Sequence, residues 1–539
     1  MQKTNIFNYF YIIAITVTSL SIVYYSGNRG VFPIDTFTFF ESGYLILNDY
    51  HPIRDYWIIS GITGDYIQAF LFKVFGVNWN SYLLHSGLLN AITTIFFYIL
   101  LKNYDLKLFE SFIFSISFTI LNYPVSGTPF TYLDAYNFSL MSIFIFFLGI
   151  LKKNNLFFFC LPFFMGISFL SMQLPSGLIN LFLIFSFLVY FFILKKNYKA
   201  IFFFIAGSLA TFALFFMYLF IINIPFKDFL IQYILFPLSF GADRISSEVN
   251  AFESAKLFNK INFKNIFFDF KHIHFFLITF YFLLFIEFRK SNKKILELIK
   301  NNFIELILFF FIFSFIFHQL ITANQIFIFS LIPILAAFTY KKVNFLFEKK
   351  IYLKTLLIIL LLFSTFKFHK RFNIDRKFME LQNFKIDLLF ERANLIDPRF
   401  NSLKWVNPSF RGSAKEEIKY LIDVKEVLSK TNQTQMLITH YQFFSIFTSK
   451  ELNIPNRWYF PNNTFPATSE NIYYNDYLKF INKKIVDNKI EIISIVMEQP
   501  KTWVNIYSKI FKDQNCIEKT IINPIFTKLD IRNCVININ

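Results

Sequence analysis

Two isolated aspartates stand where a carboxylate can do chemistry beside a membrane. Asp35 lies some ten residues beyond the first apolar segment, and Asp134 is the one charged residue in segment 122–136. A carboxylate in such a place can act as a general base that takes the proton of an attacking hydroxyl. Each aspartate can instead cap a helix, Asp35 one that starts at Thr36 and Asp134 one that starts at Tyr136, because Asp is a favoured N-cap. Both roles stay open for both residues.

Hydrogen-bonding side chains surround a charge-free turn between two later apolar segments. His318, Gln319, Asn324 and Gln325 fall within eight residues of one another. Lipid cannot satisfy polar groups, so these side chains should face water or a site. They can hold a phosphate or a sugar, or they can cap two helix ends. We favour the first role because amides lie on both sides of the turn. Arg244 is the best candidate cation for a phosphate, since the guanidinium fork matches phosphate oxygens, although a solvated loop residue is the commoner role.

Other pairs of residues suggest structure more than catalysis. Adjacent Arg54 and Asp55 predict an ion pair that holds its loop, and they are also candidate substrate contacts. Cys516 and Cys534 predict a disulfide if the tail lies in an oxidising compartment, and two buried free thiols are the alternative. No set of His and Cys at metal-binding spacing is visible. The sequence indicates no certain cofactor, and it neither demands nor excludes a divalent metal.

The elements that must position these residues are mostly apolar. Of the 539 residues, 55% are apolar and 16% are charged, against about 25% charged in soluble domains. This composition excludes an ordinary soluble enzyme along the whole length, and in a membrane protein the net charge of +18 indicates basic cytoplasmic loops rather than nucleic-acid binding. A membrane-crossing helix needs about 20 mostly apolar residues. We predict eleven spans: 6–25, 80–101, 108–123, 137–151, 156–172, 175–194, 200–222, 272–288, 302–317, 324–340 and 351–366.

The loops between these spans predict the orientation. The connections on one face each carry two to five Lys or Arg, whereas the alternate short loops NYPVSGTPFTYLDAY, SMQLPSG and HQLITANQ carry none. Lys and Arg are retained on the cytoplasmic face. We therefore expect a cytoplasmic N-terminus, and we place the first loop and the C-terminal tail on the outer side of the membrane, periplasmic in a bacterial inner membrane.

The chain divides by composition into a transmembrane module and a tail. The module, 1–366, contains a long first external loop, 26–79, with helical patterns at 36–49 and 64–75. The tail, 367–539, combines amphipathic helical patterns with buried strands, as in QMLITHY and EIISIVM, and this mixture suggests an α/β layer domain. The predicted fold class is a multi-pass α-helical membrane protein of about eleven spans with a C-terminal extracytoplasmic α/β domain, which we interpret as a lid or docking domain.

The order of motifs resembles that of the membrane glycosyltransferases called GT-C. The resemblance is closest to the branch of protein mannosyltransferases, lipid A aminoarabinose transferases and rhizobial lipopolysaccharide glycosyltransferases. The matching pieces are Asp35 after the first span, the HPIRDY string at 51–56, Gly61 with Gly64, and the FG pair at 75–76. A later turn with Gln173 resembles the family's Lys-Gln turn, with Met172 in place of the Lys. The resemblance covers roughly residues 1–366.

This resemblance implies an enzyme that moves a sugar from a polyprenyl-phosphate donor to a glycolipid, polysaccharide or protein acceptor. It implies inverting hexosyl or pentosyl transfer, with Asp35 as the base, Asp134 as a second acid, and Gln173 near the substrate. A transporter or flippase of lipid-linked glycans is one alternative, and an inactive scaffold of the same fold is another. We find no internal repeat of the kind that transporters carry. The sugar, the acceptor and the oligomeric state are not predicted.

Overall fold

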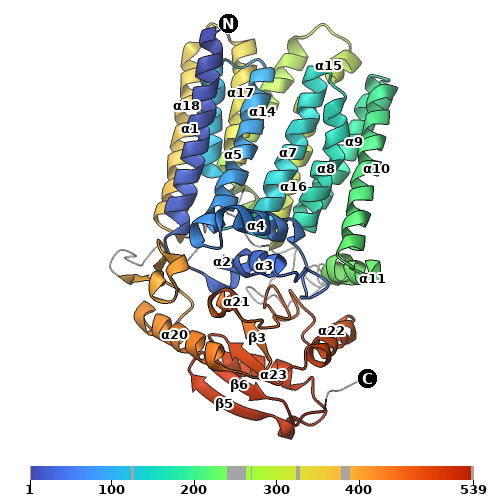
Figure 1. The fold of residues 1–539 in the computed structure, drawn as a ribbon. Coiled ribbons are helices and arrows are strands. Elements are labelled where there is room, and N and C mark those ends of the chain that lie inside the picture. The colour runs from blue at the N-terminus through green and yellow to red at the C-terminus, as the bar shows by residue number, and fades with distance from the viewer. Residues whose placement is uncertain are drawn as a thin grey trace.

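The computed structural model describes residues 2–122, 127–239, 263–268, 270–322, 328–377, 381 and 389–535. Long helices stand side by side in a bundle, and the C-terminal tail lies at one end of it, which we call the tail-side end (Figure 1). The short helices α2 (Pro33–Thr36), α3 (Thr38–Leu47) and α4 (Ile62–Phe75) lie between the bundle and the tail. The N-terminus lies at the opposite end of the bundle.

Each of the eleven predicted spans falls on a helix of the bundle. Eight helical segments of the described residues are long and apolar enough to cross a membrane. Helices α6 and α8 are apolar but shorter, and α17 has 16 residues, so the predicted total of eleven rests on these three. The bundle consists of α1 (Gln2–Gly27), α5 (Trp79–Asn103), α6 (Leu108–Leu121), α7 (Thr131–Lys152), α8 (Leu156–Ser171), α9 (Gln173–Leu188), η1 (Val189–Leu194), α10 (Tyr198–Ile221), α14 (Lys271–Lys290), α16 (Phe303–Thr322), α17 (Leu331–Leu346), α18 (Ile351–His369) and η4 (Lys370–Ile374).

Helix α7 is the centre of the bundle. In the most apolar 18-residue stretch of α7, 94% of the residues are buried, whereas the same share in α1 and in α10 is 17%. Helix α7 carries Ala135, Ser139, Ser142 and Gly149 among its larger side chains, and small residues let helices approach closely where no hydrophobic force acts between them. Other short elements lie at the ends of the long helices. They are α11 (Phe226–Phe229), η2 (Leu230–Leu235), η3 (Lys264–Phe268) and α15 (Ile295–Asn301).

Glycines shape the first loop. Gly61 precedes α4 with φ of +82° and Gly76 follows it with φ of +81°, a left-handed region in which glycine is unstrained. Gly43 lets α3 lie against α4, since a Cβ there would come within 2.7 Å of the Gln68 side chain. The helices predicted at 36–49 and 64–75 therefore form: the first is shorter at both ends, and the second begins two residues earlier and ends where predicted.

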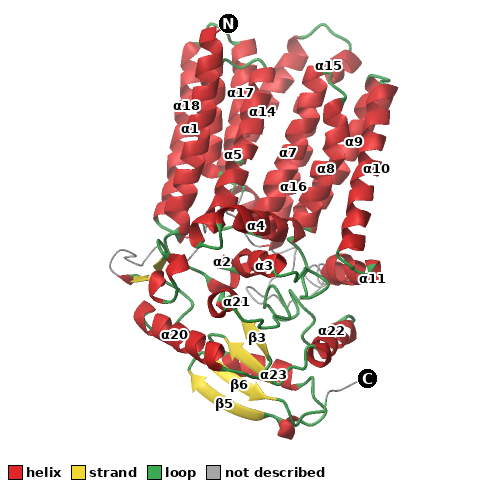
Figure 2. Cartoon of the chain, in the orientation of Figure 1, coloured by secondary structure: helices red, strands yellow, loops and turns green. Residues whose placement is uncertain are grey.

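The tail contains a four-stranded sheet, and Figure 2 shows its strands in yellow below the helices. The strand order is β3-β4-β6-β5, with β3 parallel to β4 and the other neighbours antiparallel. Every residue of β3 and β4 is buried, as expected for strands covered on both faces. The elements are β1 (Glu391–Arg392), η6 (Ala393–Leu395), η7 (Pro398–Phe400), β2 (Lys404–Trp405), α20 (Ala414–Lys430), β3 (Gln435–Thr439), α21 (Phe444–Thr448), α22 (Tyr474–Asp487), β4 (Ile492–Val496), α23 (Pro500–Ser508), η8 (Gln514–Cys516), β5 (Glu518–Asn523) and β6 (Phe526–Asp530).

The tail contains the predicted amphipathic helix at α20 and the predicted disulfide. Helix α20 begins with a capping box in which Ser413 and Glu416 each accept the other's backbone N–H. Cys516 and Cys534 form a disulfide with Cα atoms 5.1 Å apart, a separation that suits a bridge.

The tail shares a hydrophobic core with the first loop. The ring of Phe37 stacks on Trp405 at 5.8 Å and meets Phe443 edge-on at 5.0 Å. Trp79 at the start of α5 contacts Phe37 and Phe400 in the same cluster. Rings of this size dominate core energetics. The tail is thus packed into the loop and is more than a cover laid over it.

Candidate functional site

Asp35 is the third residue of α2 and caps no helix. The N-cap of α2 is Phe32, with Pro33 in the first turn, and the N-cap of α3 is Phe37. The capping role considered for Asp35 is therefore wrong. The half-buried Asp35 side chain makes no hydrogen bond or ion pair within the described residues. Burial raises its pKa to about 7, which suits a group that exchanges protons near neutral pH.

The backbone around Asp35 is held from several sides. The Tyr82 hydroxyl of α5 donates to the carbonyl of Thr36 at 2.7 Å, and the N–H of Phe32 donates to Oγ1 of Thr36 at 2.8 Å. Phe37 is fixed by the rings of the tail. Helix α5 and the tail therefore both position Asp35.

Asp134 also caps no helix, because α7 begins earlier than predicted. Its N-cap is Phe130, so Asp134 lies in the first turn, where the helix dipole favours an anion. The side chain is 2% exposed, and Oδ2 is 3.5 Å from Nε2 of His85, too far for a good hydrogen bond. Nδ1 of His85 lies 3.2 Å from Oε1 of Gln68. Gly64 makes room for the carboxylate, since a Cβ there would lie 2.6 Å from Oδ2.

A buried ion pair that sequence reasoning missed joins the loop to the tail. Nη1 of Arg457 lies 3.1 and 3.0 Å from the two carboxylate oxygens of Asp65, and both side chains are almost fully buried. Arg457 also donates to the carbonyl of Ser60, and Ser42 donates to Asp65. Burial raises the pKa of Asp65 to about 6, and the Arg457 charge opposes that rise. Gly61 admits the guanidinium, because a Cβ there would lie 2.5 Å from Nη1.

An aromatic ring lies between the surroundings of Asp134 and those of Asp65. The ring of Phe39 in α3 is 6.0 Å from that of His85, which faces Asp134, and 5.1 Å from the guanidinium carbon of Arg457, which pairs with Asp65. No hydrogen bond or ion pair joins Asp35 to Asp134. The described residues thus connect the surroundings of Asp134 to the Asp65–Arg457 pair, and they show no direct link between the two predicted acids.

The last part of helix α16, which carries His318 and Gln319, approaches the same turn of α7 as Asp134. The His318 ring stacks on Tyr132 with centroids 4.8 Å apart and planes within 3°. His318 and Gln319 are both buried, and Nε2 of Gln319 lies 3.4 Å from Nδ1 of His318. The structure thus places these two predicted residues beside α7. Asn324 lies outside the described residues, as does Arg244.

Three predicted substrate contacts have hydrogen-bond partners within the protein. Nε of Arg54 donates to Asp55 at 2.8 Å, and Asp55 also accepts the backbone N–H of His51 at 2.7 Å. This is the predicted structural ion pair. The amide of Gln173 donates to the backbone carbonyls of Ile59 and Tyr233, so it ties the start of α9 to the loop.

Within the described residues, no cluster of side chains is suited to hold a metal ion. No group of three His, Cys, Asp or Glu side chains that could hold an ion occurs in the described part of the chain. Asp134 has His85 and Gln68 beside it, and no second carboxylate joins them. We therefore assign no step to a metal.

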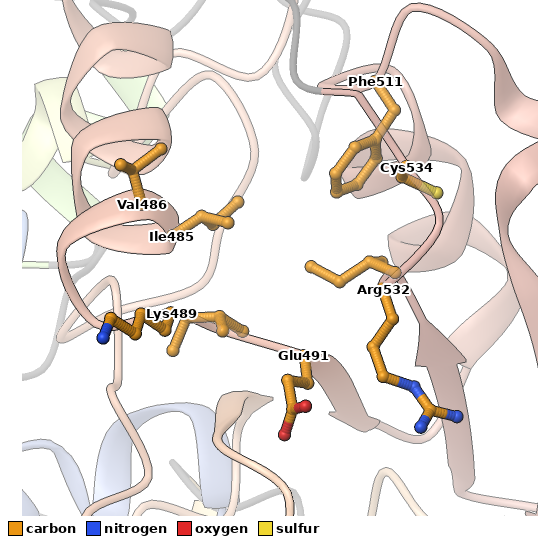
Figure 3. A pocket seen from close by; sticks show the side chains of 9 residues that line it. Ile485, Val486, Lys489, Glu491, Phe511, Arg532 and Cys534 are labelled. Atoms are coloured by element: carbon orange, nitrogen blue, oxygen red, sulfur yellow. The ribbon is translucent and has the colours of Figure 1, made fainter.

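Two pockets lie away from these residues. One of about 330 Å³ is lined by residues of α1 and α5. The other, of about 420 Å³, lies in the tail near the disulfide, and Figure 3 shows charged Lys489, Glu491 and Arg532 near apolar walls. Its lining consists of Ile485, Val486, Lys489, Ile490, Glu491, Phe511, Ile531, Arg532 and Cys534.

Comparison with known proteins adds little. No protein-family model matches the chain, and no curated protein matches its sequence. Among solved structures, the chain is similar to the crystal structure of the Archaeoglobus fulgidus oligosaccharyltransferase tethered to an acceptor peptide that contains the NVT sequon. The identity is 9%, the match covers 93% of this chain and 70% of the other, and the TM-score is 0.43. A likeness at this level supports no conclusion about activity.

Proposed function

We propose that this protein is a membrane glycosyltransferase of the GT-C type, with Asp35 as its general base. In this proposal it transfers a sugar from a polyprenyl-phosphate donor to a glycolipid, polysaccharide or protein acceptor at the outer face of a bacterial inner membrane. The observation that carries the proposal is the Asp35 carboxyl, which is half-buried, unpaired among the described residues and raised in pKa to about 7. It lies where the bundle, the loop and the tail meet, which suits a substrate that enters from the membrane.

The proposed reaction is a single displacement. The acceptor oxygen attacks the anomeric carbon from the face opposite the phosphate, and the carbon–oxygen bond to the phosphate breaks with its electron pair. The acceptor's proton passes to Asp35, and the lipid phosphate leaves. The leaving phosphate needs a cation or hydrogen-bond donors. Arg244, Asn324, His318 and Gln319 remain our proposed contacts for it, with Asp134 as a second acid.

Asp35→Asn tests this proposal, since the variant keeps the size of the side chain and loses the proton acceptor. Purified full-length variant should transfer radiolabelled sugar from a polyprenyl-phosphate donor at least about 100-fold more slowly, the usual worth of a general base. Asp49→Asn, in the same loop and with a side chain that is 84% exposed, is the matched control and should stay within about two-fold. Wild-type activity should rise with pH through about 7, because Asp35 must lose its proton to act as a base. Activity of the Asp35 variant within a few-fold of wild type would remove Asp35 from the mechanism.

Two further readouts address the alternatives. A flippase would move the labelled lipid across a vesicle membrane without releasing polyprenyl phosphate, so release of that product separates the enzyme from the transporter. A reporter enzyme that is active only outside the cytoplasm, fused after Asn539, should be active. The same reporter fused after Lys153, in a predicted cytoplasmic loop, should not be. The reverse result would place the site on the wrong side for the proposed donor.

A further inference from the structure

Four cations gather at the tail-side ends of α14 and α18. Lys271 begins α14, Lys367 lies in the last turn of α18, and Lys370 with Arg371 continues into η4. Lys271, Lys370 and Arg371 are exposed, and Lys367 is half-buried. We call these four residues the basic surface. In the predicted orientation the basic surface lies on the outer side of the membrane, where the short loops carry no Lys or Arg. These four cations are therefore an exception to the retention of Lys and Arg on the cytoplasmic face.

A histidine fixes the geometry of the basic surface without adding charge to it. Nε2 of His272 lies 3.1 Å from Nζ of Lys367, and Nδ1 lies 2.8 Å from Oγ of Ser364. A lysine ammonium can only donate, so Nε2 must accept. His272 is then neutral, with its proton on Nδ1 toward Ser364. The Lys367 ammonium is thereby held in one place instead of ranging over the surface.

The basic surface has no counter-charge among the described residues. Lys271, Lys370 and Arg371 form no ion pair there, and Asp375, which follows them on η4, pairs with none of them; Asp269, which precedes Lys271, lies outside the described residues. Lys271 and Arg371 lie close enough to Lys367 to oppose its charge. Like charges held together are unfavourable, and an anion bound among them would relieve that repulsion.

Apolar side chains beside the basic surface suit the rest of an amphiphile. Phe275, Phe363 and Phe366 are 46%, 58% and 65% exposed on the same two helices. The ring of Phe363 lies 6.2 Å from that of His272, which places the exposed rings directly beside the cations. Both helices are long and apolar enough to lie in a membrane, so these rings would contact lipid chains.

We infer that the basic surface binds the phosphate headgroup of an anionic membrane lipid, whose hydrocarbon chain lies along the exposed phenylalanines. A phosphate monoester, with up to two negative charges, should bind better than a diester, because four cations surround the position. Lys and Arg near an anionic lipid surface each contribute roughly a five-fold gain in binding. This site is separate from Asp35 and does not depend on the proposed transfer reaction.

The test uses the purified full chain in detergent, with dioleoylphosphatidic acid, dioleoylphosphatidylglycerol and dioleoylphosphatidylcholine as probes, and native mass spectrometry to count retained lipids. Wild type should retain phosphatidic acid best and phosphatidylcholine least. Lys370→Gln with Arg371→Gln should weaken phosphatidic acid binding roughly 30-fold, the product of two such contributions. The matched control, Lys195→Gln with Lys196→Gln, removes two exposed lysines at the other end of the bundle and should change it less than about three-fold.

Two results would overturn the proposed lipid site or the identity of its ligand. Equal loss in both double variants would mean that any exposed cation binds the lipid, and would overturn the site. Displacement of the lipid by millimolar inorganic phosphate would show that free phosphate is the ligand and would overturn the lipid assignment. Asp35→Asn should retain phosphatidic acid as well as wild type does, so failure of the proposed reaction and failure of this site are distinguishable. A thermal midpoint close to wild type in each double variant excludes misfolding as the cause of a loss.

Discussion

The two ends of the helix bundle bury charged side chains in different ways. We call the end of the bundle away from the tail the far end. There, Nζ of Lys342 lies 2.7 Å from Oε2 of Glu287, 2.7 Å from Oδ1 of Asn302 and 3.5 Å from Oε1 of Glu305. The hydroxyl of Tyr104 donates to Glu305 as well. Four helix ends meet at this group, and each charge has a partner of opposite sign or a hydrogen bond.

At the tail-side end, three acids have no Lys or Arg partner among the described residues. Asp35 has no hydrogen bond within the described residues, and Oδ2 of Asp134 has only the distant His85. Glu41, in α3, is 2% exposed and accepts the backbone N–H of Ser445 at 3.0 Å, but no cation of the described chain pairs with it.

The difference separates charges that hold the fold from charges that are available for chemistry. Burying an ion is costly, and a protein repays that cost only with close partners. Burial without a cation raises the pKa of Asp35 and of Glu41, and perturbed pKa values of this kind are typical of functional sites, although structural sites show them too. We therefore expect substitutions at the far end to reduce stability, and substitutions of the underpaired acids to change proton-linked behaviour.

The largest expected effect is at the far end. Lys342→Met leaves Glu287 and Glu305 buried without their cation and should destabilise the protein by about 3–5 kcal/mol, the usual cost of breaking a buried ion pair. The measurement is thermal unfolding of the purified protein in detergent. Lys349→Met, at an exposed position nearby, is the control and should change stability by less than about 0.5 kcal/mol. An unfolding midpoint that does not move would show that the Lys342 group is not structural.

A second substitution asks whether a paired charge at the tail-side end behaves like the far end. Arg457→Met leaves one carboxylate, Asp65, buried without its cation, so we expect a loss of about 3 kcal/mol. Adding Asp65→Asn to this variant should recover part of the loss, because no uncompensated charge then remains. The double-mutant cycle in thermal unfolding checks this. Losses that simply add would mean that the pair does not hold the tail to the loop.

The sequence predicted the helices and strands better than the contacts between them. Long apolar runs are dictated by the thickness of the bilayer, so every predicted span lies on a helix. The roles of Asp35 and Asp134 as caps were wrong because both helices begin earlier. Pro33 favours the first turn of a helix, and α7 starts at Thr131, six residues before the predicted span.

Long-range partners could not be predicted from one sequence. Arg457 lies 392 residues from Asp65 and is followed by an ordinary aromatic string. Nothing in its local pattern indicates a buried partner. Gly61 and Gly64 indicate close packing indirectly, because each lets a polar side chain approach the backbone. The presence of a glycine does not predict which side chain approaches it. The underpaired state of Asp35 likewise depends on what α5 and the tail place around it.

The smallest expected effect, and the most specific, is the pH dependence caused by Glu41. Burial raises the pKa of Glu41 to about 8, above its ordinary value of 4.5. Between these two values the folded protein holds a proton that the unfolded chain releases, so stability falls as pH rises through this window. Glu41→Gln keeps an oxygen that can accept the Ser445 N–H and has no charge to bury. The free energy of unfolding of the variant should match that of wild type at pH 5 and exceed it by roughly 1–2 kcal/mol at pH 8.5, allowing for relaxation around the buried group.

The control Glu348→Gln, at an exposed position, should follow wild type at both pH values. Thermal unfolding at pH 5, 7 and 8.5 measures all three proteins, and parallel loss of stability in wild type and Glu41→Gln would show that Glu41 is ionised without cost. Its environment would then resemble that of the paired carboxylates at the far end, and an unpaired, buried position would no longer distinguish the acids at the tail-side end.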